Sequence, residues 1–544
     1  MPPQKENVVR SAGIVSAAVM LSRLTGLARE IAMARLFGAG AANDAFVLGF
    51  RIPNLTRDLF AEGALSSAFV PTFTRYLTTK SRDEAVRLAN MVATALILIV
   101  GTVCVAGMFW APDLVRLLAG KFTEVPGKFE LAVRLTRIMF PFLLLVALAA
   151  QAMGILNANN KFAVPALAST FFNVGSVILG LGLGFWVMPR FGLEPIEGMA
   201  YGVLFGGGLQ LFCQAPDLLR SGFRFRPLID WSHPGLRQIF VLMGPAILGN
   251  AAVQINVVVN TNFAAGITDT AGHVINGPVT WLSCAFRFMQ LPLGLFGVAI
   301  ASATLPSISR SAAEGNMDEF RRTLTRSLGM VFLLTLPASV GLAVLGEPMA
   351  AAVYQGGKFL LEDARQTAAA LSWYAVGLAG YSALKVLAPA FYALGDARTP
   401  MLISLCSIAI NYVVASAMVR WMGHAGLALS TSVVALFNFT VLLVLIRGRI
   451  GGVNGRALAA SLMKVIAASI AMGAVCYVSS RTVQQYLGIA RWARLADLAI
   501  SVTLGAAVFY FMARATRVTE LDAAWNAIGR PLARRLGLGA GKAR

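Results

Sequence analysis

Charged residues are scarce in this chain. Asp, Glu, Lys and Arg make up 13% of its 544 residues, which is about half of their share in a soluble domain. Hydrophobic residues make up 57%, and the mean hydropathy is +0.71. These values exclude a simple soluble core and indicate that most of the chain lies in lipid.

Metal-binding and catalytic motifs are also lacking. There are three histidines and five cysteines, with no C-x-x-C pair, so we predict no metal site and no cofactor, and no disulfide can be assigned from the spacing. Walker A, H-E-x-x-H, D-D-x-x-D and a G-x-S-x-G with a triad are absent. The sequence therefore predicts a transporter rather than an enzyme, driven by something other than ATP hydrolysis.

The net charge of +21 first suggests nucleic acid as a partner. The basic residues, however, lie between apolar runs and do not form one patch with interleaved aromatics, so we expect no nucleic-acid binding. They fit charged loops on one side of a membrane, with a basic tail that faces anionic phospholipid.

Helix-length apolar runs dominate the chain. A helix needs about 20 apolar residues to cross the hydrocarbon layer, and this length predicts an all-α polytopic membrane protein with about 14 spans. The expected spans are 10–37, 44–74, 88–111, 131–156, 163–188, 198–219, 238–264, 273–305, 320–345, 366–394, 399–421, 424–446, 457–479 and 492–514. The first is too long for a signal peptide and is expected to remain in the protein.

Loop charge predicts the orientation. The connections after even-numbered spans are basic, as in 75–87, 220–237, 310–326 and 447–456, whereas the alternate connections are neutral or of mixed sign. Basic loops face the cytoplasm, so both termini of this multi-pass protein are predicted to be cytoplasmic. An amphipathic cytoplasmic helix is expected over 520–535.

A faint internal repeat is offset by about 230–235 residues. For example, Gly198-Met199-Ala200 resembles Gly426-Leu427-Ala428. Two six-span lobes with the same topology are related by an axis along the membrane normal, and such carriers bind their substrate between the lobes. The predicted divisions are an N-lobe at 1–222, a C-lobe at 223–450, two extra spans at 451–516 and a basic tail at 517–544.

Four arginines occupy predicted spans: Arg23, Arg29, Arg57 and Arg287. A charge at bilayer depth costs roughly 2.5–3.5 kcal/mol, so such residues persist where they line a water-filled cavity or hold an anion. Because the planar guanidinium matches phosphate, the set predicts a cationic chamber for a diphosphate.

Each charge also has a structural alternative. Glu30 shares a face with Arg23 and could neutralise Arg23 or Arg29, and Gly26 could allow a bend between those two arginines. Arg57 follows Pro53 and could pair with Asp58 or Glu62, whereas Arg51 could snorkel to the outer interface.

Arg287 has no acidic residue within two turns in the sequence, which favours a functional role. Lys385 adds a fifth buried cation on the cytoplasmic side, or snorkels to that interface. Asp44 opens the second span, where it serves as an N-cap or in gating. The asparagines of the seventh and later spans, including Asn256 and Asn411, hold a cation or bond neighbouring helices.

Several stretches together resemble the MurJ (MviN) family of lipid II flippases, within the multidrug, oligosaccharidyl-lipid and polysaccharide exporter superfamily. They are Ser22-Arg23-Leu24-Thr25-Gly26-Leu27-Ala28-Arg29, Phe37-Gly38-Ala39-Gly40, Asn43-Asp44-Ala45-Phe46, Pro53-Asn54-Leu55, Phe60-Ala61-Glu62-Gly63-Ala64, Ala68-Phe69-Val70-Pro71, Met243-Gly244-Pro245-Ala246-Ile247-Leu248-Gly249 and Lys385-Val386-Leu387-Ala388-Pro389.

The resemblance implies two six-helix lobes around a cationic cavity, with the last two spans forming a groove for the lipid tail. It implies that Arg23, Arg29, Arg57 and Arg287 bind substrate, joined here by Lys385, and that the acidic residues Glu30, Asp44, Asp58 and Glu62 serve in gating or charge pairing. The chain departs from the family at Phe286 and Gln290, where many relatives carry an aspartate and a glutamate.

The expected substrate is lipid II, flipped from the inner to the outer leaflet in peptidoglycan synthesis. Another polyprenyl-diphosphate glycan, or multidrug export, is the alternative. A membrane glycosyltransferase is disfavoured, because catalytic carboxylates beside a large extramembrane loop are missing. A non-transporting scaffold for envelope assembly stays open, and it would tolerate Arg287→Ala, whereas a flippase would not. The energy source stays open between a coupling ion, Na+ or H+, and the membrane potential, and other cell-wall and division proteins are candidate partners.

Overall fold

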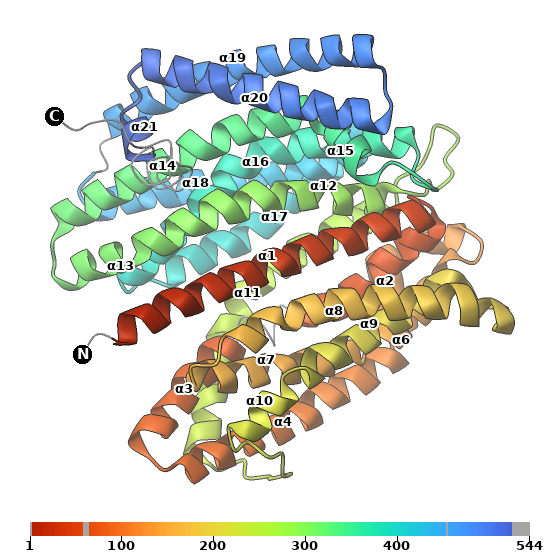
Figure 1. Cartoon of the computed structure of the whole chain (residues 1–544), viewed down its shortest axis with the longest axis vertical. Coiled ribbons are helices and arrows are strands. Elements are labelled where there is room, and N and C mark those ends of the chain that lie inside the picture. The colour runs from red at the N-terminus through yellow and green to blue at the C-terminus, as the bar shows by residue number, and fades with distance from the viewer. Residues whose placement is uncertain (1–2, 58–64, 453–454, 525–544) are drawn as a thin grey trace. The chain divides into compact units, whose positions relative to one another are not determined.

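The computed structural model describes residues 3–57, 65–452 and 455–524. Within these ranges the regular structure is helical, and the only β features are two isolated bridges, Thr268 with Val274 and Gly356 with Phe359. The prediction of an all-α protein is confirmed (Figure 1). Asp58, Glu62 and the end of the expected tail helix at 520–535 lie outside the described residues, of which α21 (Thr519–Ala524) covers the start.

The chain divides into two compact units, the first comprising Met1–Thr280 with Gly356–Phe359, and the second Trp281–Gln355 with Leu360–Arg544. The first unit holds α1 (Pro3–Phe37), α2 (Ala41–Arg57), α3 (Ser66–Thr79), α4 (Arg82–Phe109), α5 (Ala111–Ala119), η2 (Gly120–Glu124), α6 (Lys128–Met139), α7 (Phe142–Ala158), α8 (Ala163–Gly182), η3 (Leu183–Val187), η4 (Met188–Phe191), α9 (Pro195–Phe212), α10 (Ala215–Arg220) and α11 (Pro234–Ala265).

Helix α12 (Pro278–Pro292) begins in the first unit and continues in the second. The second unit then holds η5 (Leu293–Val298), α13 (Ala299–Ala313), α14 (Met317–Val344), α15 (Gly346–Tyr354), α16 (Leu361–Ala393), α17 (Arg398–Met422), α18 (His424–Arg449), α19 (Gly455–Leu487), α20 (Arg491–Ala515) and α21. The predicted lobe boundaries at 222 and 450 stay predictions.

Eleven helical stretches among the described residues are long and apolar enough to cross a membrane. They are 82–109, 128–158, 163–191, 195–220, 278–313, 317–344, 361–393, 398–422, 424–449, 458–487 and 491–515. The expected count of 14 is not confirmed, since α1, α2 and α11 are outside this set. Helix α2 is only 17 residues long, and the span predicted at 44–74 includes residues outside the described ranges.

Side chains at the ends of the long helices satisfy backbone groups that the helix itself leaves unpaired. Ser81 Oγ accepts a hydrogen bond from the N–H of Glu84 at the start of α4, at 3.2 Å. Asn316 Oδ1 accepts one from the N–H of Glu319 at the start of α14, at 3.0 Å. Both helices carry acidic residues in their first turn, where the helix dipole favours negative charge.

Glycines set the spacing between α8 and α9. A Cβ on Gly202 would lie 2.4 Å from the carbonyl oxygen of Ser176 on α8, and one on Gly198 would lie 2.2 Å from the backbone nitrogen of Gly184 on η3, which directly follows α8. One on Gly206 would lie 2.7 Å from the carbonyl oxygen of Phe172. These two helices therefore meet backbone to backbone, as small residues allow in membranes.

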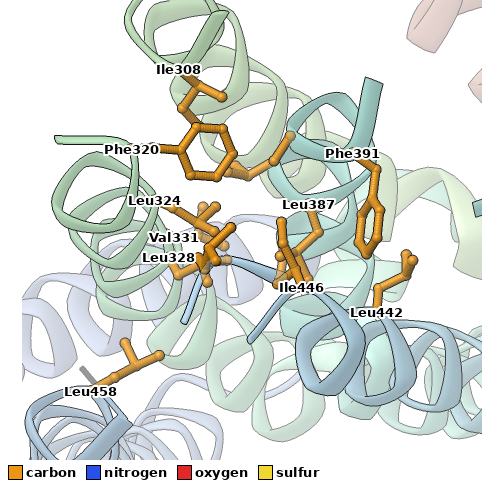
Figure 2. Packing of buried hydrophobic residues seen from close by; sticks show 14 of the residues in the cluster. Ile308, Phe320, Leu324, Leu328, Val331, Leu387, Phe391, Leu442, Ile446 and Leu458 are labelled. Carbon is orange, nitrogen blue, oxygen red and sulfur yellow. The ribbon is translucent and has the colours of Figure 1, made fainter. Parts of the chain in front are cut away.

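The second unit packs around an apolar cluster drawn from α13, α14, α16, α17, α18 and α19 (Figure 2). Phe320, Leu324, Leu328, Leu387 and Phe391 are completely buried in it. Leu458 joins it from α19, so the predicted thirteenth span is anchored to the helices before it. Beyond this cluster, α19 and α20 lie side by side (Figure 1).

Candidate substrate site and a buried ion pair

Arg29 of α1 is half-buried between two aromatic rings. The carbon of its guanidinium lies 5.6 Å from the ring centre of Phe50 on α2 and 5.1 Å from that of Phe172 on α8. A cation placed over aromatic faces is attracted by their negative π clouds. The two rings therefore fix the position of Arg29.

Arg23 is exposed on the same helix, and α1 runs unbroken through Gly26 between the two arginines. Gly26 instead leaves room for a side chain of a neighbouring helix. A Cβ on Gly26 would lie 3.3 Å from Nδ2 of Asn173 on α8. That nitrogen donates to the carbonyl oxygen of Ser22 at 3.1 Å. Asn173 thus holds the part of α1 between its arginines, and sequence reasoning missed it because its partners lie about 150 residues away along the chain.

Helix α2 carries cations toward its C-terminal end. Nη1 of Arg51 donates to Oγ1 of Thr261 on α11 at 2.6 Å, so this guanidinium is held against a neighbouring helix. Arg57 is half-buried at the last residue of α2. The proposed pairing of Arg57 with Asp58 or Glu62 falls on residues outside the described ranges and stays a prediction.

Asp44 lies near the opposite end of α2, about 20 Å from Arg57 along the axis, so the structure does not bring these two predicted residues together. Its carboxylate is buried and accepts four hydrogen bonds. Oδ2 receives Lys128 Nζ at 3.0 Å and the N–H of Gly277 at 2.8 Å. Oδ1 receives the N–H and Oγ1–H of Thr280, at 3.0 and 2.7 Å.

This arrangement corrects the prediction of an N-cap. Helix α2 already begins at Ala41, so Asp44 lies within its first turn. The carboxylate instead satisfies N–H groups around Pro278, where α12 begins. Asp44 therefore acts as a cap for another helix, a role that only tertiary structure reveals.

Lys128 is a second residue that sequence reasoning missed. Its side chain is buried at the start of α6, with Nζ 4.0 Å from the ring centre of Phe122 and 2.9 Å from Oδ1 of Asn276. In the sequence it lies in a short connection of mixed charge, a pattern that is typical of a solvent-exposed loop. No signal distinguished it, because its carboxylate partner is 84 residues earlier.

A short turn at residues 356–359 packs against the end of α1. The N–H of Lys358 donates to the carbonyl oxygen of Arg35 at 2.8 Å. Gly38 has φ +68°, and a Cβ there would lie 2.6 Å from the carbonyl oxygen of Lys358. The Phe37-Gly38-Ala39-Gly40 stretch thus needs glycine at Gly38 for both backbone conformation and space.

In the second unit, Arg287 of α12 is exposed and its Nη1 donates to Oε1 of Gln290, one turn later, at 3.2 Å. Phe286 points elsewhere and meets the Tyr374 ring edge-on, with ring centres 5.4 Å apart. The two departures from the family pattern therefore differ in effect. Gln290 contacts the arginine as a neutral acceptor, whereas Phe286 contributes to packing with α16.

Lys385 of α16 is exposed within the second unit. The described residues contain no cluster of three or more His, Cys, Asp or Glu side chains able to hold a metal ion. The predicted roles of all nine charged residues in binding and gating stay predictions, since geometry alone places the groups without showing what they bind.

Comparison with known proteins decides the family. A model described as lipid II flippase MurJ matches residues 33–496. The chain belongs to the MurJ family. The probable lipid II flippase MurJ of Vibrio cholerae serotype O1 is 36% identical over 446 residues, covering 80% of this chain and 82% of the relative. The lipid II flippase MurJ of Burkholderia cenocepacia is 34% identical over 447 residues, covering 81% and 84%.

Solved structures show the same fold. A lipid II flippase MurJ in an inward closed conformation superposes with a TM-score of 0.74 at 24% identity, covering 92% of this chain and 98% of that one. An inward-facing multidrug resistance MATE family transporter of the MOP superfamily superposes with a TM-score of 0.64 at 16% identity, covering 81% and 98%. The MurJ family is a family of membrane transporters, so membership agrees with the apolar helices of this chain.

Proposed function

We propose that this protein flips lipid II from the inner to the outer leaflet of the bacterial cytoplasmic membrane, with both termini in the cytoplasm. The observation that carries the proposal is membership of the MurJ family over residues 33–496, together with arginines on helices expected to cross the membrane. The protein acts as a carrier and catalyses no covalent reaction.

The diphosphate of the lipid is the group that the arginines recognise. Arg29 is pre-positioned by Phe50 and Phe172, so its binding to phosphate costs less side-chain entropy than binding by a free arginine. Arg23 and Arg287 are exposed, and Arg57 and Lys385 add further positive charge. Bidentate guanidinium–phosphate hydrogen bonds supply the specificity.

The polyprenyl tail remains in lipid and lies along α19 and α20. Apolar side chains on these helices are exposed, including Met463, Ile470, Val502 and Phe511. Exposed side chains of this kind are compatible with a hydrocarbon chain, whose own surroundings are equally apolar.

Alternating access moves the head group across, and charge supplies the direction of return. Moving one charge across 100 mV is worth about 2.3 kcal/mol, and the positive charge of the arginines is drawn toward the negative inside when no diphosphate is bound. The membrane potential, or a coupled Na+ or H+, therefore resets the carrier. No resident cofactor is required.

The test is lipid II exposure on the outer face of cells in which this chain is the only flippase. Arg287→Ala is compared with wild type at matched membrane abundance, and Arg420→Ala, which removes an exposed arginine near the end of α17, is the control. We expect exposure with wild type and control, and loss with Arg287→Ala. Wild-type protein that is inserted but exposes no lipid II would refute the substrate assignment.

A different polyprenyl-diphosphate glycan is the second candidate, since its diphosphate offers the arginines the same chemistry. Export of a cationic drug is disfavoured, although a MATE transporter shares the fold, because four arginines repel a cation. Lipid II and another polyprenyl-diphosphate glycan are distinguished by measuring how well each competes for binding to the purified protein.

A further inference from the structure

The connection between α10 and α11 is an extended strap, defined here as residues 221–231, that is tied to the side of α4. Asn90 of α4 bonds it twice, with Nδ2 donating to the carbonyl oxygen of Arg224 at 3.2 Å and Oδ1 accepting from the N–H of Arg226 at 3.0 Å. Oγ1 of Thr94 accepts from the N–H of Leu228 at 3.0 Å. At the start of the strap, Arg82 Nη2 donates to the carbonyl oxygen of Ser221 at 2.6 Å.

These bonds determine which side chains lie on the same side of the strap. The N–H groups of Arg226 and Leu228, two residues apart, both point at α4, which is the period of extended chain. The side chains of Arg224 and Arg226 consequently lie on one side of the strap. Both are exposed, and no carboxylate of the described residues forms an ion pair with either.

Neighbouring carboxylates are already engaged. Asp217 pairs with Arg220 at 3.5 Å and with Lys161 at 3.8 Å. Asp230 accepts from the N–H of Ser232 at 3.1 Å. The strap therefore presents two guanidinium groups whose charge its own surroundings do not neutralise.

Large apolar side chains accompany the two arginines. Phe225, Ile229 and Trp231 are 48%, 63% and 49% exposed. The Trp231 ring stacks on Phe240 of α11, with ring centres 6.3 Å apart and planes 27° apart. A shallow hollow beside Trp231 is lined by Met91, Thr94, Ala95 and Leu98 of α4 and by Leu228, Ile229, Asp230 and Leu236.

The strap lies beside the part of α4 where charged residues give way to an apolar run, which is the pattern of a boundary between phospholipid head groups and hydrocarbon. Arg82 and Thr94, which bond its beginning and its later part, are about 18 Å apart along α4. Charged residues fill the first turns of α4, and an apolar run follows Asn90. Tryptophan prefers this boundary, where its ring is amphipathic.

We infer that the strap and the adjoining face of α4 form a binding site for an anionic glycerophospholipid. Its phosphate binds Arg224 and Arg226, and an acyl chain lies against the exposed side chains of Ile229 and Trp231. Guanidinium groups match phosphate geometry, and the negative cytoplasmic leaflet supplies the ligand. The site requires nothing of lipid II transport.

Native mass spectrometry of the purified full chain, titrated with phosphatidylglycerol and with phosphatidylcholine, tests the charge selection. Wild type is expected to prefer phosphatidylglycerol, and Arg224→Ala/Arg226→Ala to bind it about 30-fold more weakly. Both residues bond α4 through backbone groups, so the strap itself is retained. Arg116→Ala/Arg190→Ala, which removes two exposed arginines elsewhere in the first unit, is the matched control and should bind like wild type.

Quenching by brominated phosphatidylglycerol in lipid nanodiscs locates the acyl chain. Trp231→Phe should remove more of the quenching than Trp110→Phe, which removes an exposed tryptophan at the other end of α4. Equal phosphatidylglycerol binding by wild type and the strap double variant, or equal quenching loss in the two tryptophan variants, would overturn the inference. If the strap double variant bound phosphatidylglycerol like wild type but no longer bound a cytoplasmic protein, the surface would be assigned to a protein partner instead.

Discussion

Nζ of Lys128 lies 3.0 Å from Oδ2 of Asp44, and the two side chains are 0% and 1% exposed. Taking two charges out of water is costly, and the cost is recovered only when the geometry is good and the remaining hydrogen-bonding groups are satisfied. Here the carboxylate accepts three further hydrogen bonds from Gly277 and Thr280. The pair is therefore a structural element of the first unit, and both partners depend on each other.

Removing one partner should be worse than removing both charges. Lys128→Met leaves a buried carboxylate without its cation, and breaking a buried pair in this way costs about 3–5 kcal/mol. Lys128→Met/Asp44→Asn should recover part of that loss, because no charge is left uncompensated. Thermal unfolding of the purified variants measures the loss of stability in Lys128→Met and its partial recovery in the double variant. Equal melting temperatures for wild type and Lys128→Met would contradict a buried ion pair here.

Gly38→Ala should destabilise the contact between the end of α1 and the turn at 356–359. The added Cβ meets a carbonyl oxygen at 2.6 Å on a backbone with φ +68°, and such strain costs about 1–3 kcal/mol. Gly40→Ala is the control, since its Cβ would approach only the carbonyl oxygen of Phe37 at 3.7 Å. A melting temperature that falls equally in both variants would refute the specific role of Gly38.

Arg29→Lys should weaken lipid II binding about tenfold while leaving the fold intact. Lysine keeps the charge but loses the planar fork that binds phosphate bidentately and stacks on aromatic faces. Binding of lipid II to purified protein is the measurement, and Arg190→Lys, at an exposed position outside the proposed site, is the control. Unchanged affinity in Arg29→Lys would show that Arg29 acts only through its charge.

Asp396 should make the thermal stability of the protein depend on pH in the acidic range. Hydrogen bonds from Thr399, through its side chain and its N–H, and the nearby charge of Arg449 hold the pKa of Asp396 below its usual range. Because the folded state lowers this pKa, the stabilisation is present at neutral pH and disappears as pH falls through the folded pKa, below about pH 4. Asp396→Asn should therefore melt below wild type at pH 7, and the difference should shrink toward pH 3. A difference independent of pH would contradict this.

Local patterns in the sequence were sufficient for the helices and for the positions of the cations. Apolar runs of spanning length identify a helix wherever it lies, and Arg23, Arg29 and Arg287 stand out because charge is rare there. The number of spans was harder to predict. Helix α2 has only 17 residues, and segments that carry several charges do not meet a simple hydropathy criterion.

Polar contacts between helices could not be predicted, because their partners come from distant parts of the chain. Lys128 with Asp44, Asn173 with Ser22, and Arg51 with Thr261 are separated by 84, 151 and 210 residues. The contact of Gln290 with Arg287 differs, since one helical turn separates the two residues and the i, i+3 rule places them together. Helix periodicity thus predicts neighbours on one helix, whereas contacts between helices depend on the fold.

The glycines between α8 and α9 have a consequence for sequence variation. Gly198, Gly202 and Gly206 recur every four residues, and each faces backbone atoms that cannot retreat as a flexible side chain would. In a library that replaces every position in turn, these three should tolerate almost nothing, although they carry no charge and bind no ligand. The intolerant positions would then recur every four residues along α9, and mutational data alone would reveal where this helix contacts α8.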